Sequence, residues 1–189
     1  MRVLVACEFS GIVRDAFLAR GHDAMSCDLL PSERPGPHYQ GNVLDLLGDG
    51  WDMMIAHPPC TYLTLACTWR WRTTQDEIRE AANFFLKLWH CSIPHIAIEN
   101  PPGWLNSHVL RPAQTVQPWW FGERYTKATS LWLKNLPPLT PTRVTPRSER
   151  NSKYIVNMAP SPERWKLRSK TPHGLAEAMA DQWGGTLHV

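Results

Sequence analysis

The sequence predicts an α/β protein whose mostly parallel sheet is covered by helices on both faces. Over the first hundred residues, short apolar runs typical of buried strands alternate with segments of helical periodicity. Two of the apolar runs, residues 53–56 and 95–98, are followed closely by a Pro-Pro pair, as expected where a buried strand reaches the edge of a sheet. The chain of 189 residues is long enough for one domain with its own core, and it contains no apolar run of a membrane-spanning length.

The first third of the chain predicts two strands separated by a helix. Residues 2–7 form the first strand, and Ser10 is placed to cap a helix that ends before Gly21. Residues 22–27 form a second strand that ends at Asp28. A loop rich in proline and glycine follows.

The middle third continues the strand–helix alternation. Thr74 is placed to cap a helix over about residues 75–91, and residues 96–99 form the next strand. The apolar positions of this helix repeat every three or four residues, which predicts one buried face. That face consists of Ile78, Ala81, Ala82, Phe85, Leu88 and Trp89.

The last third is irregular and rich in proline, a residue that cannot lie inside a central strand. We expect one strand at residues 129–133, a weaker one at 154–157 and a closing helix over 171–183 that begins with Thr171-Pro172. The chain is therefore predicted to be one domain of three parts. Residues 1–123 form the core, 124–170 a basic segment and 171–183 the closing helix.

Positive charge is concentrated in the basic segment. The net charge of the chain is +3, but residues 124–170 contain 11 Lys or Arg against two acids, Glu149 and Glu163. Since such a segment attracts phosphate, we expect it to contact nucleic acid or a nucleotide. Arg124 and Lys127, just before the strand at 129–133, are the candidate phosphate-binding residues.

A thiol and a carboxylate follow the two apolar runs that end near prolines. Cys60 comes after the first run, and Glu99 and Asn100 end the second. Ligands of parallel sheets bind beyond the carboxyl ends of the strands, so both groups are expected to face one crevice. A thiol on a loop stiffened by proline suits a nucleophile, and a helix beginning near Thr61 would lower its pKa.

The segment Pro58-Pro59-Cys60, followed by Glu99-Asn100, resembles the Pro-Cys and Glu-Asn motifs of the cytosine-5 methyltransferases. The resemblance implies a Rossmann-like class I fold that uses S-adenosylmethionine. In that family the thiolate, here Cys60, adds to carbon 6 of cytosine, while the acid, here Glu99, binds the ring nitrogen and exocyclic amine. Carbon 5 then accepts the methyl group, and loss of its proton releases the enzyme. The implied catalytic set is completed by Pro59 and Asn100, and a base in duplex DNA must leave its stack.

Residues of the first half are similar to the family's cofactor site. Phe9 and Gly11 match a Phe-x-Gly motif, Asp28 the acid that binds ribose, and Asp45 the acid near the adenine amine. An acid about twenty residues after the first loop is also typical of dinucleotide sites. The closing helix stands where the family's last motif returns to the cofactor. The contacts implied for S-adenosylmethionine are Phe9, Ser10, Gly11, Asp28, Asp45 and Pro58.

The sequence also departs from the family's pattern. His57 replaces a glycine, Thr61 replaces a glutamine, and Pro101 stands where valine is common. About forty residues separate Leu133 from the last helix, too few for a separate target-recognition domain. The resemblance is therefore closest to the short, phage-encoded versions of the family. We expect low sequence selectivity, selectivity supplied by a partner or second copy, or a substrate other than duplex DNA.

Two other functions stay open. An amino-methyltransferase motif has an acid or amide before Pro-Pro and an aromatic residue after it, whereas His57 and Cys60 hold those positions here. A catalytically inactive relative would bind nucleic acid through the basic segment and stack bases on tryptophans. The tryptophans concerned are Trp69, Trp71, Trp119 and Trp120. A zinc deaminase would need a second cysteine at Leu63, and no metal is expected.

Five cysteines without the spacing of a disulfide framework indicate a reducing compartment, and we expect a cytoplasmic protein. Besides Cys60, the cysteines are expected to be inert; they are Cys7, Cys27, Cys67 and Cys91. DNA is the expected partner, with RNA or a free cytosine nucleotide as secondary candidates.

Overall fold

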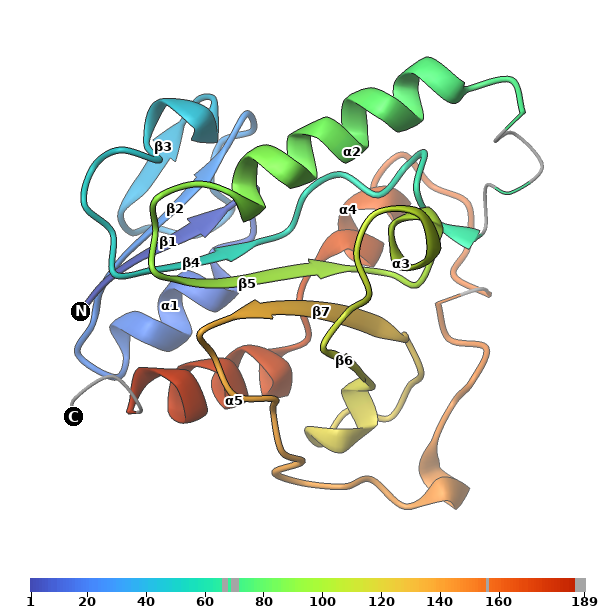
Figure 1. Cartoon of the computed structure of the whole chain (residues 1–189). Coiled ribbons are helices and arrows are strands. Elements are labelled where there is room, and N and C mark those ends of the chain that lie inside the picture. The colour runs from blue at the N-terminus through green and yellow to red at the C-terminus, as the bar shows by residue number, and fades with distance from the viewer. Residues whose placement is uncertain (66–67, 69–71, 156, 186–189) are drawn as a thin grey trace.

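The computed structural model describes residues 1–65, 68, 72–155 and 157–185, and its centre is a seven-stranded sheet. The strand order is β3-β2-β1-β4-β5-β7-β6 (Figure 1). The strands are β1 (Arg2–Ala6), β2 (Asp23–Asp28), β3 (His38–Gln40), β4 (Met53–Ala56), β5 (His95–Asn100), β6 (Gln114–Val116) and β7 (Thr129–Lys134). The α-helices are α1 (Ile12–Leu18), α2 (Gln75–Trp89), α3 (Trp104–His108), α4 (Arg164–Ser169) and α5 (His173–Gly184).

Five strands of the sheet run in one direction. β3, β2, β1, β4 and β5 are parallel to their neighbours, whereas β7 is antiparallel to both β5 and β6. Ala6 of β1 pairs with Ala56 of β4, which in turn pairs with Ile98 of β5. β1 and β4 therefore end at the same level and β5 continues for two more residues, so the residues that follow these strands start from one edge of the sheet.

The two faces of the sheet carry separate cores, because alternate side chains of each strand point to opposite sides. On one side, Val3 and Val5 pack with α1 and α5; on the other, Leu4 and Ala6 pack with α2. Figure 1 shows α5 and α1 beneath the sheet and α2 above it. The predicted stripe of α2 is confirmed: four of its six residues are buried, and they are Ile78, Ala82, Phe85 and Leu88.

The predicted strands at the centre of the sheet and the long helices are confirmed, whereas short elements were missed. β3 lies inside the loop predicted from prolines and glycines, and it pairs with β2 alone at the edge of the sheet. The strand expected at residues 154–157 is wrong, since residues 152–155 form a turn and residue 156 lies outside the described residues. Prolines at 160 and 162 follow closely, and proline has no backbone N–H group to donate to a neighbouring strand. The segment therefore cannot continue as a regular strand.

The start of α1 differs from the prediction that Ser10 caps it. Ser10 Oγ accepts a hydrogen bond from Ile12 N at 3.3 Å, but the buried carboxylate of Glu8 accepts from Val13 N at 2.7 Å and from Arg14 N at 3.2 Å. A carboxylate at this position accepts hydrogen bonds from two backbone N–H groups that have no partner within the helix. Its negative charge also interacts favourably with the positive end of the helix dipole. Glu8 therefore fixes the turn between β1 and α1.

A buried arginine on α1 organises the loop after β2. The Arg14 side chain is fully buried, and its guanidinium donates to Ser26 Oγ, Ser32 Oγ and the carbonyl oxygen of Pro35 at 3.0–3.2 Å. It also forms an ion pair with Asp15 at 2.7 Å. Because a buried charge is tolerated only when it is paired and hydrogen-bonded, this contact holds the loop against the sheet edge.

Among the helices that the structure describes, none is long and apolar enough to cross a membrane.

Candidate active site

The loops that follow β4 and β5 are joined into one unit. Asn100 Nδ2 donates to the carbonyl oxygen of Pro58 at 2.8 Å, and Trp104 N donates to the carbonyl oxygen of Leu63 at 2.7 Å. Thr64 also pairs with Gly103 in an isolated antiparallel bridge. The loop that carries the predicted nucleophile Cys60 is therefore bonded to the end of β5, which carries Glu99, and to the loop that follows β5.

Gly103 is required where these loops approach most closely. A Cβ atom at this position would lie 1.9 Å from the carbonyl oxygen of Leu63, far inside van der Waals contact. The backbone at Gly103 is extended, so the constraint comes from space and not from its dihedral angle. Sequence analysis assigned this glycine no role.

Glu99 is paired with His57, the residue that departs from the family's glycine. The Nδ1 atom of His57 lies 3.4 Å from Oε2 of Glu99, and the two side chains are 8% and 15% exposed. Within the part of the chain that the structure describes, His57 Nε2 and Asn100 Oδ1 are buried without a hydrogen-bond partner. Such unpaired groups are rare in folded proteins, and these two belong to the residue that contacts Glu99 and to the residue that follows it.

The pKa of Glu99 is lowered on balance. Burial would raise it, but the hydrogen bond from His57, the charge of Lys127 and the neighbouring Thr129 hydroxyl together lower it more. The Thr129 hydroxyl also lies 3.1 Å from the carbonyl oxygen of Lys127, so its single proton serves one of the two acceptors. Glu99 is consequently a carboxylate whose negative charge is stabilised by His57, Lys127 and Thr129.

The environment of Cys60 contradicts the expected helix at Thr61. Residues 61–63 form a turn, in which Leu63 N and Thr64 N donate to the carbonyl oxygen of Cys60 at 3.0 and 3.1 Å. Burial raises the pKa of the Cys60 thiol, Glu99 raises it further, and Lys127 and Arg168 lower it in part. The groups that favour the thiolate are therefore the cations Lys127 and Arg168, which lie far from Cys60 in the sequence, and not the start of a helix.

The residues predicted to bind the cofactor occupy the same edge of the sheet. Phe9 is buried and lies 6.0 Å, ring to ring, from Trp165 of α4, and Gly11 has a left-handed φ of 71°. Among the described residues, the backbone N–H groups of Phe9, Ser10 and Gly11 form no hydrogen bond. This leaves a short row of donors between β1 and α1.

The two predicted acids lie after the neighbouring strands. Asp28 ends β2, and its Oδ1 accepts from Leu30 N at 2.9 Å. Asp45 is exposed at the end of a short 3-10 helix (Val43–Asp45) and lies 3.4 Å from the Tyr39 hydroxyl. Between them, Leu29 is 74% exposed, an apolar surface beside the acid that the sequence reasoning missed.

The two predicted phosphate-binding residues do not lie in one place. Lys127 is partly buried beside the catalytic pair, donates to the carbonyl oxygen of Lys170 at 3.3 Å, and lines a cavity of about 270 Å³. That cavity is also lined by Ile12, Arg168 and the Thr171–Pro172 pair, so the start of the closing helix does face this side of the protein.

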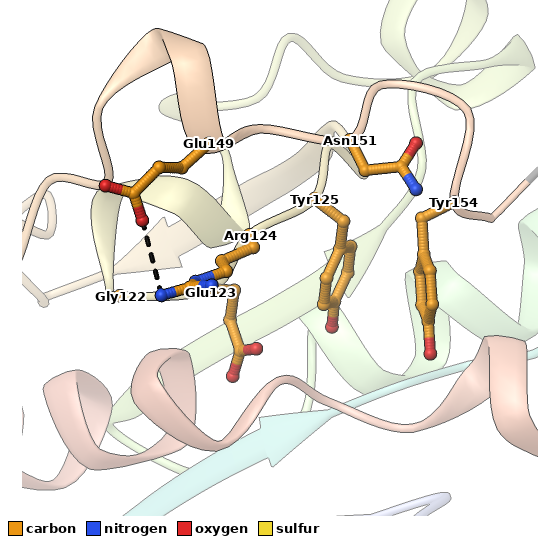
Figure 2. Close-up of a pocket in the computed structure, with 7 residues that line it drawn as sticks. All are labelled: Gly122, Glu123, Arg124, Tyr125, Glu149, Asn151 and Tyr154. Carbon is orange, nitrogen blue, oxygen red and sulfur yellow. Dashed lines mark ion pairs between the residues drawn. The ribbon is translucent and has the colours of Figure 1, made fainter.

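Arg124 instead lines a second, larger cavity of about 590 Å³ and pairs with Glu149 at 3.3 Å (Figure 2). The predicted base-stacking tryptophans do not line either cavity where they are described. Trp119 packs under the Arg150 guanidinium and against Trp120, whereas Trp69 and Trp71 lie outside the described residues.

Sequence reasoning did not assign a role to His57, Arg168 or Glu8. His57 was visible only as a departure from a motif, and Arg168 lies about 110 residues from Cys60, so its approach needs the folded structure. Glu8 precedes the Phe-x-Gly motif, and its acidic side chain directly before a helix was an available capping signal.

Comparison with known proteins supports the fold. No family model and no curated protein matches the sequence. A solved structure that matches is a prophage-encoded protein (E. coli) to which DNA modification methyltransferase activity has been ascribed. The two share 15% identity and a TM-score of 0.52 over 77% of this chain, which spans about half (52%) of that structure's length. The fold is thus the α/β, Rossmann-like fold of methyltransferases.

The close approach at Gly103 generates a test of the joined loops. In Gly103→Ala, the new methyl group must displace the Leu63 carbonyl and break its hydrogen bond to Trp104, and overpacking of this kind costs about 1–3 kcal/mol. Urea unfolding should show this loss. Gly48→Ala is the matched control, because a Cβ atom there meets nothing within 4 Å. Equal stability of the two variants would contradict the joined loops.

Proposed function

We propose that this protein transfers a methyl group from S-adenosylmethionine to carbon 5 of cytosine in DNA, through a covalent bond between Cys60 and carbon 6. The observation that carries the proposal is the register of two adjacent parallel strands, β4 and β5. Ala56, the last residue of β4, lies opposite Ile98 of β5, so Glu99 comes one residue past this level in β5 and Cys60 follows β4 at the same edge. Their charges interact, since Glu99 raises the pKa of Cys60. A thiol and a carboxylate that share one site can act on opposite sides of one pyrimidine ring.

The residues at the sheet edge fit S-adenosylmethionine. The free N–H groups of Phe9, Ser10 and Gly11 suit a carboxylate, and Asp28 suits a pair of ribose hydroxyls. The exposed side chain of Leu29, next to Asp28, offers an apolar face for an aromatic ring. When bound, the cofactor would supply the electrophilic methyl group that carbon 5 accepts.

Cytosine binding itself would activate the thiol. In the free protein, burial and the negative charge of Glu99 keep the pKa of Cys60 raised. When the carboxylate of Glu99 accepts a hydrogen bond from the exocyclic amine of cytosine, that donor partly compensates its negative charge. The penalty on the thiolate then falls, and Lys127 and Arg168 remain to stabilise it.

His57 and Glu99 would supply the proton that the cytosine ring takes up when Cys60 adds to it. As the Cys60 sulfur bonds to carbon 6, the electron pair of the 5,6-double bond would be delocalised toward ring nitrogen 3, which takes up a proton. Because Glu99 is a carboxylate in the free protein, that proton would come from a protonated His57, whose Nδ1 lies 3.4 Å from Oε2, and would pass through Glu99 to ring nitrogen 3. After methylation, loss of the proton from carbon 5 restores the double bond and expels the Cys60 thiolate.

The unpaired buried atoms support a ligand at this place. His57 Nε2 and Asn100 Oδ1 lack partners among the described residues, and a polar base edge would supply them. The prophage protein of the same fold supports DNA as the substrate, since DNA modification is the activity ascribed to it. The basic segment between residues 124 and 170 would attract the strand.

Nucleoside mass spectrometry tests this function. The purified protein, incubated with S-adenosylmethionine and unmodified DNA, should produce 5-methylcytosine, and Cys60→Ala should produce none because the covalent step is lost. Cys91→Ala is the matched control, since Cys91 packs with the α2-side core. N-methylated cytosine or adenine would instead identify an amino-methyltransferase, and 5-methylcytosine formed by Cys60→Ala would contradict the proposed nucleophile.

A second prediction concerns His57. His57→Gln removes the imidazole that lowers the pKa of Glu99, so the acid limb of the kcat/KM profile should move to higher pH. We also expect kcat to fall by roughly tenfold or more, in keeping with loss of a proton-transfer group. His95→Gln is the control, because His95 starts β5 at the opposite end of the strand. An unchanged pH profile in His57→Gln would exclude this role.

A further inference from the structure

The larger cavity has the form of a second ligand site. Its volume of about 590 Å³ lies within the range of small-molecule sites. Figure 2 shows Tyr125 and Tyr154 side by side on one wall, with Glu149 and Arg124 at the other end. None of its lining residues belongs to the Cys60–Glu99 pair.

The two tyrosines offer an aromatic face. Their ring centroids are 5.0 Å apart and their planes are inclined by 35°, so they already contact each other. Tyr154 is 48% exposed, while burial and the charge of Glu123 raise the pKa of Tyr125 and keep its phenol neutral. A planar ligand cannot enter between the rings, but it can stack on the open side of Tyr154.

The polar groups of the cavity include donors, on Arg124 and Asn151, and two carboxylates that differ in their pairing. Glu149 is paired with Arg124, but the carboxylate of Glu123 has no hydrogen bond or ion pair among the described residues. The unpaired carboxylate of Glu123 repels a phosphate and attracts a donor such as an aromatic amine. The cavity therefore suits a base with an exocyclic amino group, while the phosphates of the strand stay away from Glu123.

The larger cavity adjoins the smaller one. It shares Glu123, Tyr125 and Tyr154 with the smaller cavity, whose lining also contains Lys127 and Arg168. Both of these cations lie near enough to Cys60 to lower the pKa of its thiol. The basic strip from Arg168 and Lys127 to Tyr154 therefore offers one strand a path from the active site to the larger cavity.

We propose that the Tyr125–Tyr154 cavity binds a second nucleobase of the substrate strand, one with an exocyclic amino group, and that the substrate is single-stranded DNA. The inference rests on the proposed function and assigns its substrate class. A base that stacks on Tyr154 inside a cavity has left any complementary strand, so a duplex cannot fill this site without opening at two positions. The site would also make binding depend on the identity of a second base.

Binding measurements on the full chain test this inference without requiring turnover. The probes are fluorescent oligonucleotides with one cytosine in a tract of adenine, or in a tract of nebularine, which is adenine without its amino group. Fluorescence anisotropy at fixed salt should give a Kd about tenfold lower for the single-stranded adenine probe. Glu123→Ala, which removes the acceptor, should abolish this difference. Equal affinity of the wild-type protein for the two probes would overturn the amino-group assignment.

Tyr154 supplies the matched variants. Tyr154→Ala should raise the Kd of the adenine probe roughly tenfold, since stacking on one aromatic residue is lost. Tyr154→Phe keeps the ring, and Val144→Ala removes an exposed side chain of the same segment outside both cavities, so both should bind within about twofold of wild type. Wild-type affinity in Tyr154→Ala, or tighter binding of the annealed duplex than of the single strand, would overturn the inference.

The two proposals fail separately. If Tyr154→Ala weakens binding but no 5-methylcytosine forms, the subsite stands and the methyl-transfer proposal falls. If 5-methylcytosine forms equally on both strand types and Tyr154→Ala acts like wild type, the function stands and the subsite falls.

Discussion

The register of β4 against β5 is the constraint on which the rest of this protein depends. Ala56 lies opposite Ile98, so both strands deliver their next residues to one level of the sheet edge. The hydrogen bond from Asn100 to the carbonyl oxygen of Pro58, and the contact of Gly103 with Leu63, then lock the following loops together. Shifting either strand by one residue would turn its side chains to the other face and separate the thiol from the carboxylate.

Buried charge at this edge is balanced by contributions from distant parts of the chain. Glu99 remains a carboxylate because His57, Lys127 and the Thr129 hydroxyl oppose the effect of burial on its pKa. The same carboxylate raises the pKa of Cys60 and so disfavours its thiolate. In the proposed reaction, a base that engages Glu99 would release this restraint, which links substrate binding to activation of the nucleophile.

The central fold was predictable because its signals are long and redundant. The strand at residues 53–56 is apolar throughout, and α2 repeats its buried face over four turns. Short edge elements such as β3 carry no such pattern, because one-sided pairing over three residues places few demands on side chains. In the candidate site, Cys60 and Glu99 could be found from their strand ends, but the approach of Arg168 to Cys60 joins positions far apart in sequence and depends on the folded basic segment. The expected helix at Thr61 was wrong because the chain there bonds to the loop of Gly103 instead.

Covalent trapping tests the central claim most directly. The protein is incubated with S-adenosylmethionine and single-stranded DNA that contains 5-fluorocytosine, whose carbon 5 has no proton to lose after methylation. The account predicts a complex that survives denaturation, with the DNA attached at Cys60 in the peptide mass spectrum, and no complex in Cys60→Ala. Failure to trap any adduct with a preparation that methylates ordinary cytosine would contradict the covalent mechanism.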